Sequence, residues 1–137
     1  MATAEVYIKD ALREINVLSE VDPLPAEMGS HGLRRLNQMM SLWKIKDIDL
    51  GYFDLAATTE EVAIPDWADL AVTLGLAAVL APKYGKSLSG EFLGIAMSTI
   101  GAVKTKILVE AKGPVDMSYL PVGSGHYGRG NSILTDR

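Results

Sequence analysis

The chain has 137 residues, 48% of them hydrophobic and 22% charged, and its formal net charge is −4. This length corresponds to one domain, and the apolar content is too high for a disordered chain. The chain contains no cysteine, which excludes disulfides, thiolate metal sites and cysteine catalysis. Its two histidines, His31 and His126, lie too far apart in sequence to indicate a multi-histidine metal site. We therefore expect a folded domain with no cofactor.

Two amphipathic helices are predicted in the first third of the chain. The first runs from about Thr3 to Leu18, with Thr3 as its N-terminal cap. A proline-containing turn follows, and the second helix runs from Pro25 or Ala26 to Lys46. Apolar residues recur at helical spacing in both: Ala4, Tyr7, Ile8, Ala11, Leu12 and Ile15 in the first, and Met28, Leu33, Leu36, Met40 and Trp43 in the second.

Residues 47–65 interrupt the helical pattern, because polar and apolar residues alternate there. Two short extended pieces fit this segment, arranged as a loop or as a β-hairpin. Two strands alone are only marginally stable, so we expect the segment to lean on the helices or on another subunit. Glu60 and Glu61 are adjacent, and adjacent side chains of an extended strand point to opposite sides. This spacing disfavours a catalytic pair of carboxylates and favours a solvated loop.

Two strongly apolar helices are predicted in the second half, over residues 66–81 and about 88–112. Ser87 or Ser89 caps the second of them. Each contains a charge-free run, Leu70–Pro82 and Phe92–Val103. Since a membrane span needs about 20 residues, we expect buried helices and no membrane contact.

Small residues recur along one face of each of these two helices. We predict that the two faces meet in a close antiparallel pair, because small side chains let helix backbones approach. The residues concerned are Ala71, Gly75 and Ala78 in the first helix, and Gly90, Gly94, Ser98 and Gly101 in the second.

Residues 113–137 form a distinct segment, with five glycines, two prolines and no helical period. An apolar segment of this kind cannot build a core of its own and gains order by lying on a surface. We therefore divide the chain into a helical domain, 1–112, and an extended C-terminal arm, 113–137. The predicted fold class is mainly α, a four-helix core with a small loop or β-hairpin at 47–65 and the arm. The apolar residues of the arm are Val115, Met117, Tyr119, Leu120, Val122, Tyr127, Ile133 and Leu134.

Five motifs occur in an order that resembles phage head-to-tail connector proteins. They are ALREINV at 11–17, LNQMMSLW at 36–43, GYF at 51–53, APKYG at 81–85 and YLPVGSG at 119–125. The last is similar to the P-x-G-S-G arm of the tail accessory factor, or packaged-DNA stabilisation protein, of short-tailed phages. The resemblance covers nearly the whole chain, and it implies a structural protein of the virion neck or tail that has no enzymatic activity and assembles in the host cytoplasm.

The resemblance also implies partners. These are the portal protein, further copies of the chain in a ring that is commonly of twelve, and a downstream tail or nozzle protein. The resemblance further implies that DNA passes through the central channel of this ring without specific binding. The arm implies an interface with the portal or a neighbouring subunit, to which we add Tyr127 and Arg129 because Tyr and Arg are enriched at contact hot spots. The predicted interface residues are Tyr119, Leu120, Pro121, Val122, Gly123, Ser124, Gly125, Tyr127 and Arg129.

Two other functions are weighed against this one. The first is a DNA-binding helical oligomer of the packaging machinery, similar to a small terminase subunit, although the net acidic charge disfavours phosphate binding. The second is a small hydrolase using Glu60 or Glu61. The Gly123–Gly128 stretch matches G-x-G-x-x-G but lacks the preceding strand and following helix of a dinucleotide site.

Overall fold

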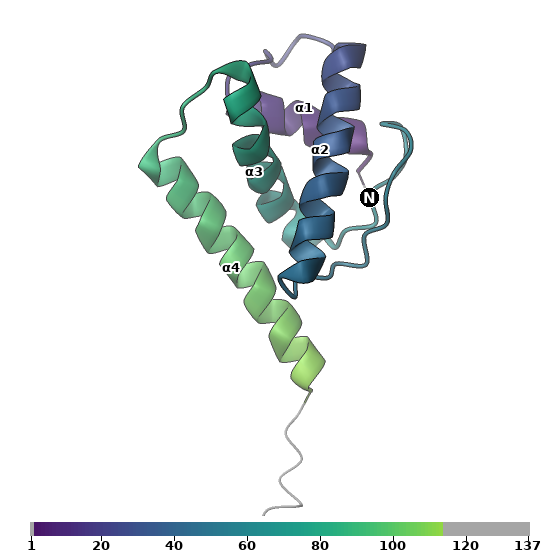
Figure 1. Cartoon of the computed structure of the whole chain (residues 1–137), viewed down its shortest axis with the longest axis vertical. Coiled ribbons are helices and arrows are strands. Elements are labelled where there is room, and N and C mark those ends of the chain that lie inside the picture. Colours follow the sequence, from purple (N-terminus) through teal and green to yellow (C-terminus); the bar gives the residue numbers. More distant parts are fainter. Residues whose placement is uncertain (1, 114–137) are drawn as a thin grey trace, which may run out of the picture.

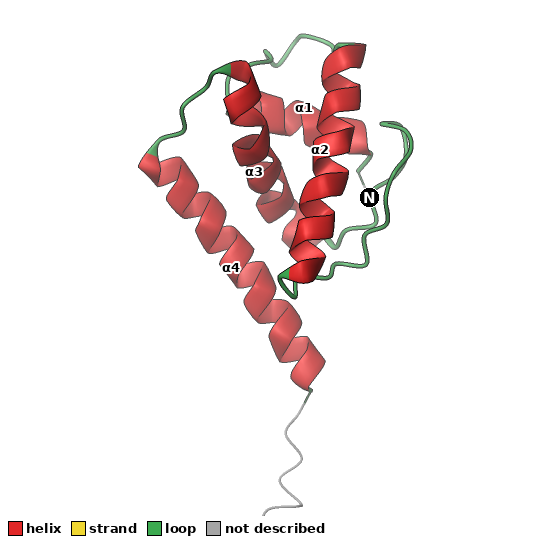
Figure 2. Ribbon diagram, in the orientation of Figure 1, coloured by secondary structure: helices red, strands yellow, loops and turns green. Residues whose placement is uncertain are grey.

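The computed structural model describes residues 2–113. These residues form four α-helices and two short 3-10 helices, and none of them forms a β-strand (Figures 1 and 2). The predicted mainly-α fold with four helices is confirmed. The predicted interface residues of the arm, Tyr119 to Arg129, lie outside the described residues. The elements are α1 (Ala4–Glu14), α2 (Ala26–Ile45), η1 (Asp66–Ala68), α3 (Asp69–Leu80), η2 (Ala81–Tyr84) and α4 (Gly90–Lys112).

Helix α3 is the central element of the fold. It packs against α1, α2 and α4, and Figure 1 shows it between α2 and α4, with α1 crossing behind. Its sequence is apolar on every side, which matches burial from several directions. Val72, Leu76 and Leu80 are each at most 1% exposed. After η2, the chain leaves the helix direction at Gly85, whose φ of +66° is a conformation that glycine adopts without strain.

The N-terminus of α1 is satisfied by backbone groups. Thr3 was predicted to cap this helix, but its side chain makes no capping hydrogen bond. Instead, the Ala4 amide donates to the carbonyl of Glu60 (3.0 Å), and the Glu5 amide donates to the carbonyl of Thr58 (2.8 Å). The first-turn amides, which have no partner inside a helix, are therefore paired with the 47–65 segment.

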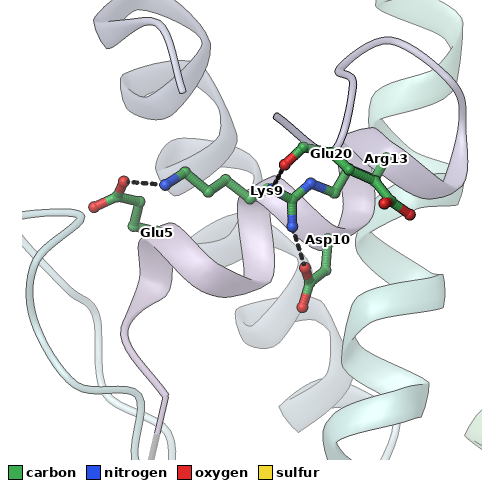
Figure 3. Close-up of polar contacts among 5 residues, drawn as sticks. All are labelled: Glu5, Lys9, Asp10, Arg13 and Glu20. Carbon is green, nitrogen blue, oxygen red and sulfur yellow. Dashed lines mark hydrogen bonds and ion pairs between the residues drawn. The ribbon is translucent and has the colours of Figure 1, made fainter. Parts of the chain in front are cut away.

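The C-terminus of α1 comes earlier than predicted, at Glu14 instead of Leu18. Asn16 has a φ of +57°, which turns the chain out of the helix. Figure 3 shows how Arg13 holds this turn: its guanidinium donates to the carbonyl of Glu20 at 2.8 Å and lies 3.4 Å from Asp10. Arg13 thus ties the turn after α1 back to the helix.

The 47–65 segment is a loop that lies on the helices, and the hairpin alternative is wrong. Its one bridge pairs Glu61 with Thr3. Asn37 of α2 anchors the middle: its side-chain amide donates to the Leu55 carbonyl (3.0 Å) and accepts from the Leu55 amide (3.2 Å). The same Asn37 oxygen accepts from the Tyr52 hydroxyl. The Asn37 side chain therefore provides hydrogen bonds that a second strand would provide in a hairpin. The expectation that the helices support this segment is confirmed.

Helix α4 lies against α3 and leaves most of its surface outside the core. It begins at Gly90, and the predicted cap by Ser89 is confirmed, since the Ser89 hydroxyl accepts from the Phe92 amide at 3.1 Å. Only Ala96 and Val103 are buried. Phe92–Val103 was predicted to be a buried run, and this prediction is wrong, because α4 packs mainly on one neighbour, α3.

Helices α3 and α4 pack against each other as predicted, but the prediction that the glycines of α4 form this contact is wrong. A β-carbon built on Gly90, Gly94 or Gly101 would meet no atom within 4 Å. A β-carbon on Gly75 would instead approach Trp43 of α2, whose Cζ2 lies at 3.1 Å. The small face of α3 at Gly75 therefore packs against Trp43 of α2 and against Ile100 of α4, whose Cδ1 would lie 3.7 Å from the same β-carbon, whereas the glycines of α4 face away from the core.

Candidate functional site

The charge-free run of α4 is the most unusual surface of the described residues. Phe92–Val103 contains no charged residue on any side of the helix, yet Ile95 is 57% exposed and Met97 is 73% exposed. Leu93, Gly94, Ser98, Gly101 and Ala102 are exposed as well. Contiguous exposed apolar surface of this kind marks an interaction site in soluble proteins.

One side of this run opens onto a groove between α2 and α4, which has a volume of about 350 Å³. Its floor is the face of α3 that carries Gly75. Because Gly75 has no side chain, the Trp43 ring can pack against this face. Arg35 and Lys46 of α2 line its edge. We call it the α2–α4 groove, and its apolar walls are Leu42, Trp43, Val79, Leu93, Met97 and Ile100.

The opposite side of the run forms a second apolar surface. Here α4 and the start of α3 enclose a cleft of about 200 Å³, which adjoins a shallow hollow between Glu91 and Thr99. Leu70 is 58% exposed, and the Lys106 ammonium lies 5.2 Å from the centre of the exposed Trp67 ring. We call this surface the outer flank, and its residues are Trp67, Leu70, Ile95, Ser98, Thr99 and Ala102.

The acidic pair considered in the sequence serves the loop. The Glu60 carboxylate accepts hydrogen bonds from the amides of Ala56 (3.0 Å) and Ala57 (2.7 Å), which closes the turn. Glu61 takes part in the bridge to Thr3. This geometry gives Glu60 a structural role in the loop.

His31 is the one histidine among residues 2–113, and it sits in a basic surrounding. Burial of its ring lowers the pKa, and the nearby cations Lys83, Arg35 and Arg34 lower it further. In the part of the chain that the structure describes, no three His, Cys, Asp or Glu side chains gather as a metal site would require. Among the described residues, the surface features that stand out are the groove and the outer flank, both of which are apolar.

Sequence reasoning placed the binding surface in the arm and missed the groove and the outer flank. Residues 119–129 fall beyond the described part of the chain, so this interface stays a prediction. The sequence contains one half of the missed signal, since Phe92–Val103 is apolar around the whole helix. The structure supplies the other half, since α3 covers one side of this run. A helix that is apolar all round and has one neighbour in its own chain leaves apolar sides uncovered.

Helix α4 also satisfies a simple membrane criterion. Among the described residues, Gly90–Lys112 is one helix that is long and apolar enough to span a membrane, by length and composition alone. A scan against known protein families and a search of curated proteins find no match for this chain.

Proposed function

We propose that this chain is a subunit of a ring-forming head-to-tail adaptor of a phage virion, without catalytic activity. The observation that carries the proposal is the exposed, charge-free Phe92–Val103 run of α4. A subunit that works in an assembly has such surfaces because neighbouring subunits complete its core. The resemblance of the five motifs to phage connectors supplies the kind of assembly.

In this proposal helix α4 and the arm make different contacts. The exposed surfaces of α4 hold copies of the chain together, and the arm, 113–137, reaches the portal. The net charge of −4 suits a channel through which DNA must slide, since negative groups do not hold phosphates. The ring extends the portal channel and presents a platform for the next tail or nozzle protein.

Electron microscopy of the full chain mixed with its portal protein tests this proposal. We expect a ring of added density beneath the portal. A chain that ends at Lys112 retains every buried core residue of the described part, so it should fold normally. It should nevertheless dock poorly on the portal, because it lacks the arm. Equal docking by the shortened chain would remove the role of the arm.

A DNA titration separates the proposal from the packaging alternative. An adaptor that lets DNA slide should bind DNA weakly at physiological salt. Tight binding with a steep salt dependence, together with failure to form a complex with the portal, would favour a small-terminase-like protein and overturn the adaptor proposal.

A further inference from the structure

We infer that the α2–α4 groove of one copy receives the outer flank of the next copy, so that the chain assembles head to tail. The inference rests on the proposed function, which supplies the second copy as partner, and it adds which surfaces meet. A closed ring needs such a contact, because each subunit must join two neighbours through two different patches.

The two surfaces belong to one helix but face different ways. Successive residues of an α-helix are separated by about 100° around the axis, so Ile95 and Met97 point about 160° apart, on nearly opposite sides of the helix. Met97 lines the α2–α4 groove, while Ile95 lies in the hollow of the outer flank. A rigid helix therefore carries one patch on each side, which is the arrangement that head-to-tail association requires.

The shapes of the two patches differ in a complementary way. The groove is a concave apolar site that Gly75 helps to line. The outer flank presents Leu70 and Ile95, which are 58% and 57% exposed. Large exposed aliphatic side chains on one surface and an apolar groove on the other form the anchor and pocket of a protein interface.

The charges at the edges of the two patches are also complementary. Arg35 and Lys46 lie at the edge of the groove. The outer flank carries Glu91 and Lys106, and the charge of Lys106 is balanced by its ion pair with Glu110 at 3.1 Å. Arg35, Lys46 and Glu91 take part in no ion pair among residues 2–113. Opposite charges at the rims steer association and fix its register, which favours groove against flank over groove against groove.

A lipid bilayer fits the run less well than a second copy does. Twelve helical residues rise about 18 Å, which is shorter than the about 30 Å hydrocarbon core. Glu91 and Lys104 flank Phe92–Val103 on its two ends, and α3 covers one side of it. The run has the length and the partial cover of an interface helix.

Cysteine cross-linking tests the contact directly, because the chain has no cysteine of its own. Leu42→Cys places a thiol at the groove and Ile95→Cys places one on the outer flank. The full chain carrying both changes is bound to its portal and treated with a short bis-maleimide. We expect a ladder of covalent oligomers on a denaturing gel, reaching the full ring.

Single-cysteine and mixed samples distinguish the geometry. Each single variant should give no cross-link, and an equal mixture of the two should give covalent dimers and nothing larger. A control pairs Leu42→Cys with Val21→Cys, which is 92% exposed and lies in the turn after α1; it should give no ladder. Dimers from a single variant would indicate a symmetric contact and overturn the inference.

Two further outcomes separate this inference from the proposed function. Portal-bound rings without a ladder would overturn the groove-to-flank contact and leave the adaptor role standing. A cross-link between the thiols introduced by Leu42→Cys and Leu120→Cys in the same chain would show that the arm fills the groove, which also overturns the inference. A chain that forms no complex with the portal and instead binds phosphatidylcholine vesicles would overturn both.

Discussion

Helices α3 and α4 carry charge-free runs of similar length, Leu70–Pro82 and Phe92–Val103, and they have opposite surroundings. Helix α3 is in contact with three other helices, and most of its side chains are buried. Helix α4 packs mainly on α3 and buries only Ala96 and Val103. The composition of a helix indicates how much of its surface must be covered, and the number of neighbours decides whether its own chain does the covering.

The two helices also contribute differently to stability: α3 stabilises the fold of the single chain, and in the proposed ring α4 stabilises the assembly. The body formed by α1, α2 and α3 with the 47–65 loop contains the fully buried side chains, among them Ile8, Leu36 and Val62. It is closed on itself through buried contacts and hydrogen bonds. Helix α4 adds apolar surface whose burial depends on a partner, so changes in α4 should alter assembly more than folding.

The largest difference is expected from truncating one aliphatic side chain in each helix. Leu76 of α3 is fully buried, and Leu76→Ala should lower the free energy of unfolding by about 2–5 kcal/mol. Ile95 of α4 is half exposed, and Ile95→Ala should change it by less than about 0.5 kcal/mol while weakening ring formation. Chemical denaturation and electron microscopy measure the two effects. Equal losses of stability would contradict the division between body and α4.

A pair of glycine substitutions sharpens the same division. A β-carbon on Gly32 of α2 would lie 2.6 Å from Cγ2 of the buried Ile8, so Gly32→Ala should lower stability by about 1–3 kcal/mol through overpacking. The matched change Gly101→Ala meets no atom within 4 Å and should raise stability by about 0.5–1 kcal/mol through helix propensity. Thermal unfolding of both variants gives the signs. A destabilised Gly101→Ala variant would show that α4 is more closely packed than the structure indicates.

The hydrogen bonds of Asn37 provide a test inside the body. Asn37→Ala removes the partner of the Tyr52 hydroxyl and of the Leu55 backbone, so it should lower stability by about 1–3 kcal/mol. The neighbouring Gln38→Ala, which removes an exposed hydrogen bond to Arg35, should have little effect. Urea titration compares them, and amide exchange in 47–65 should rise only in the Asn37 variant. Unchanged exchange would mean that the loop is held by other contacts.

Helix positions were predictable because periodicity and capping are local signals. The Ser89 cap, the end of α3 near Pro82 and the four helices follow from spacing and residue type. Burial of α4 was not predictable in this way, since a linear pattern does not reveal how many neighbours a helix has. The amides at the start of α1 illustrate the same limit: Thr3 is a suitable cap, but the carbonyls of the distant 47–65 segment take its place.

The sequence predicted that the binding surface is apolar, but it did not predict where on the helices this surface lies. From the sequence we assigned the apolar surface that the chain cannot cover to the arm, and the structure shows further surface of this kind on the helices, including Met97 and Leu70. The groove requires α2, α3 and α4 to meet, which is a tertiary relationship. The lining residues Leu42, Val79 and Leu93 come from three helices, and in the sequence each one reads as an ordinary position of an amphipathic or buried helix.

The hydroxyl of Tyr7 provides a test in which the pH dependence of stability distinguishes the body from α4. Burial and the hydrogen bond to Asp69 (2.5 Å) raise the pKa of the Tyr7 hydroxyl above its usual value of 10.0. A folded-state pKa above the unfolded one gives stability that is present below pH 10 and is lost as the pH rises further. Tyr7→Phe should therefore cost about 1 kcal/mol at pH 7 and lessen the loss of stability above pH 10.

Thermal unfolding between pH 7 and pH 11 measures this change. Some alkaline sensitivity should persist in the variant, because burial also raises the pKa of Tyr52. Helix α4 contains no tyrosine, so Ile95→Ala should follow the wild-type pH profile. If Tyr7→Phe and wild type lose stability in parallel above pH 10, the Tyr7–Asp69 link between α1 and α3 does not contribute to the body, and the alkaline response must come from Tyr52 or from groups outside the body.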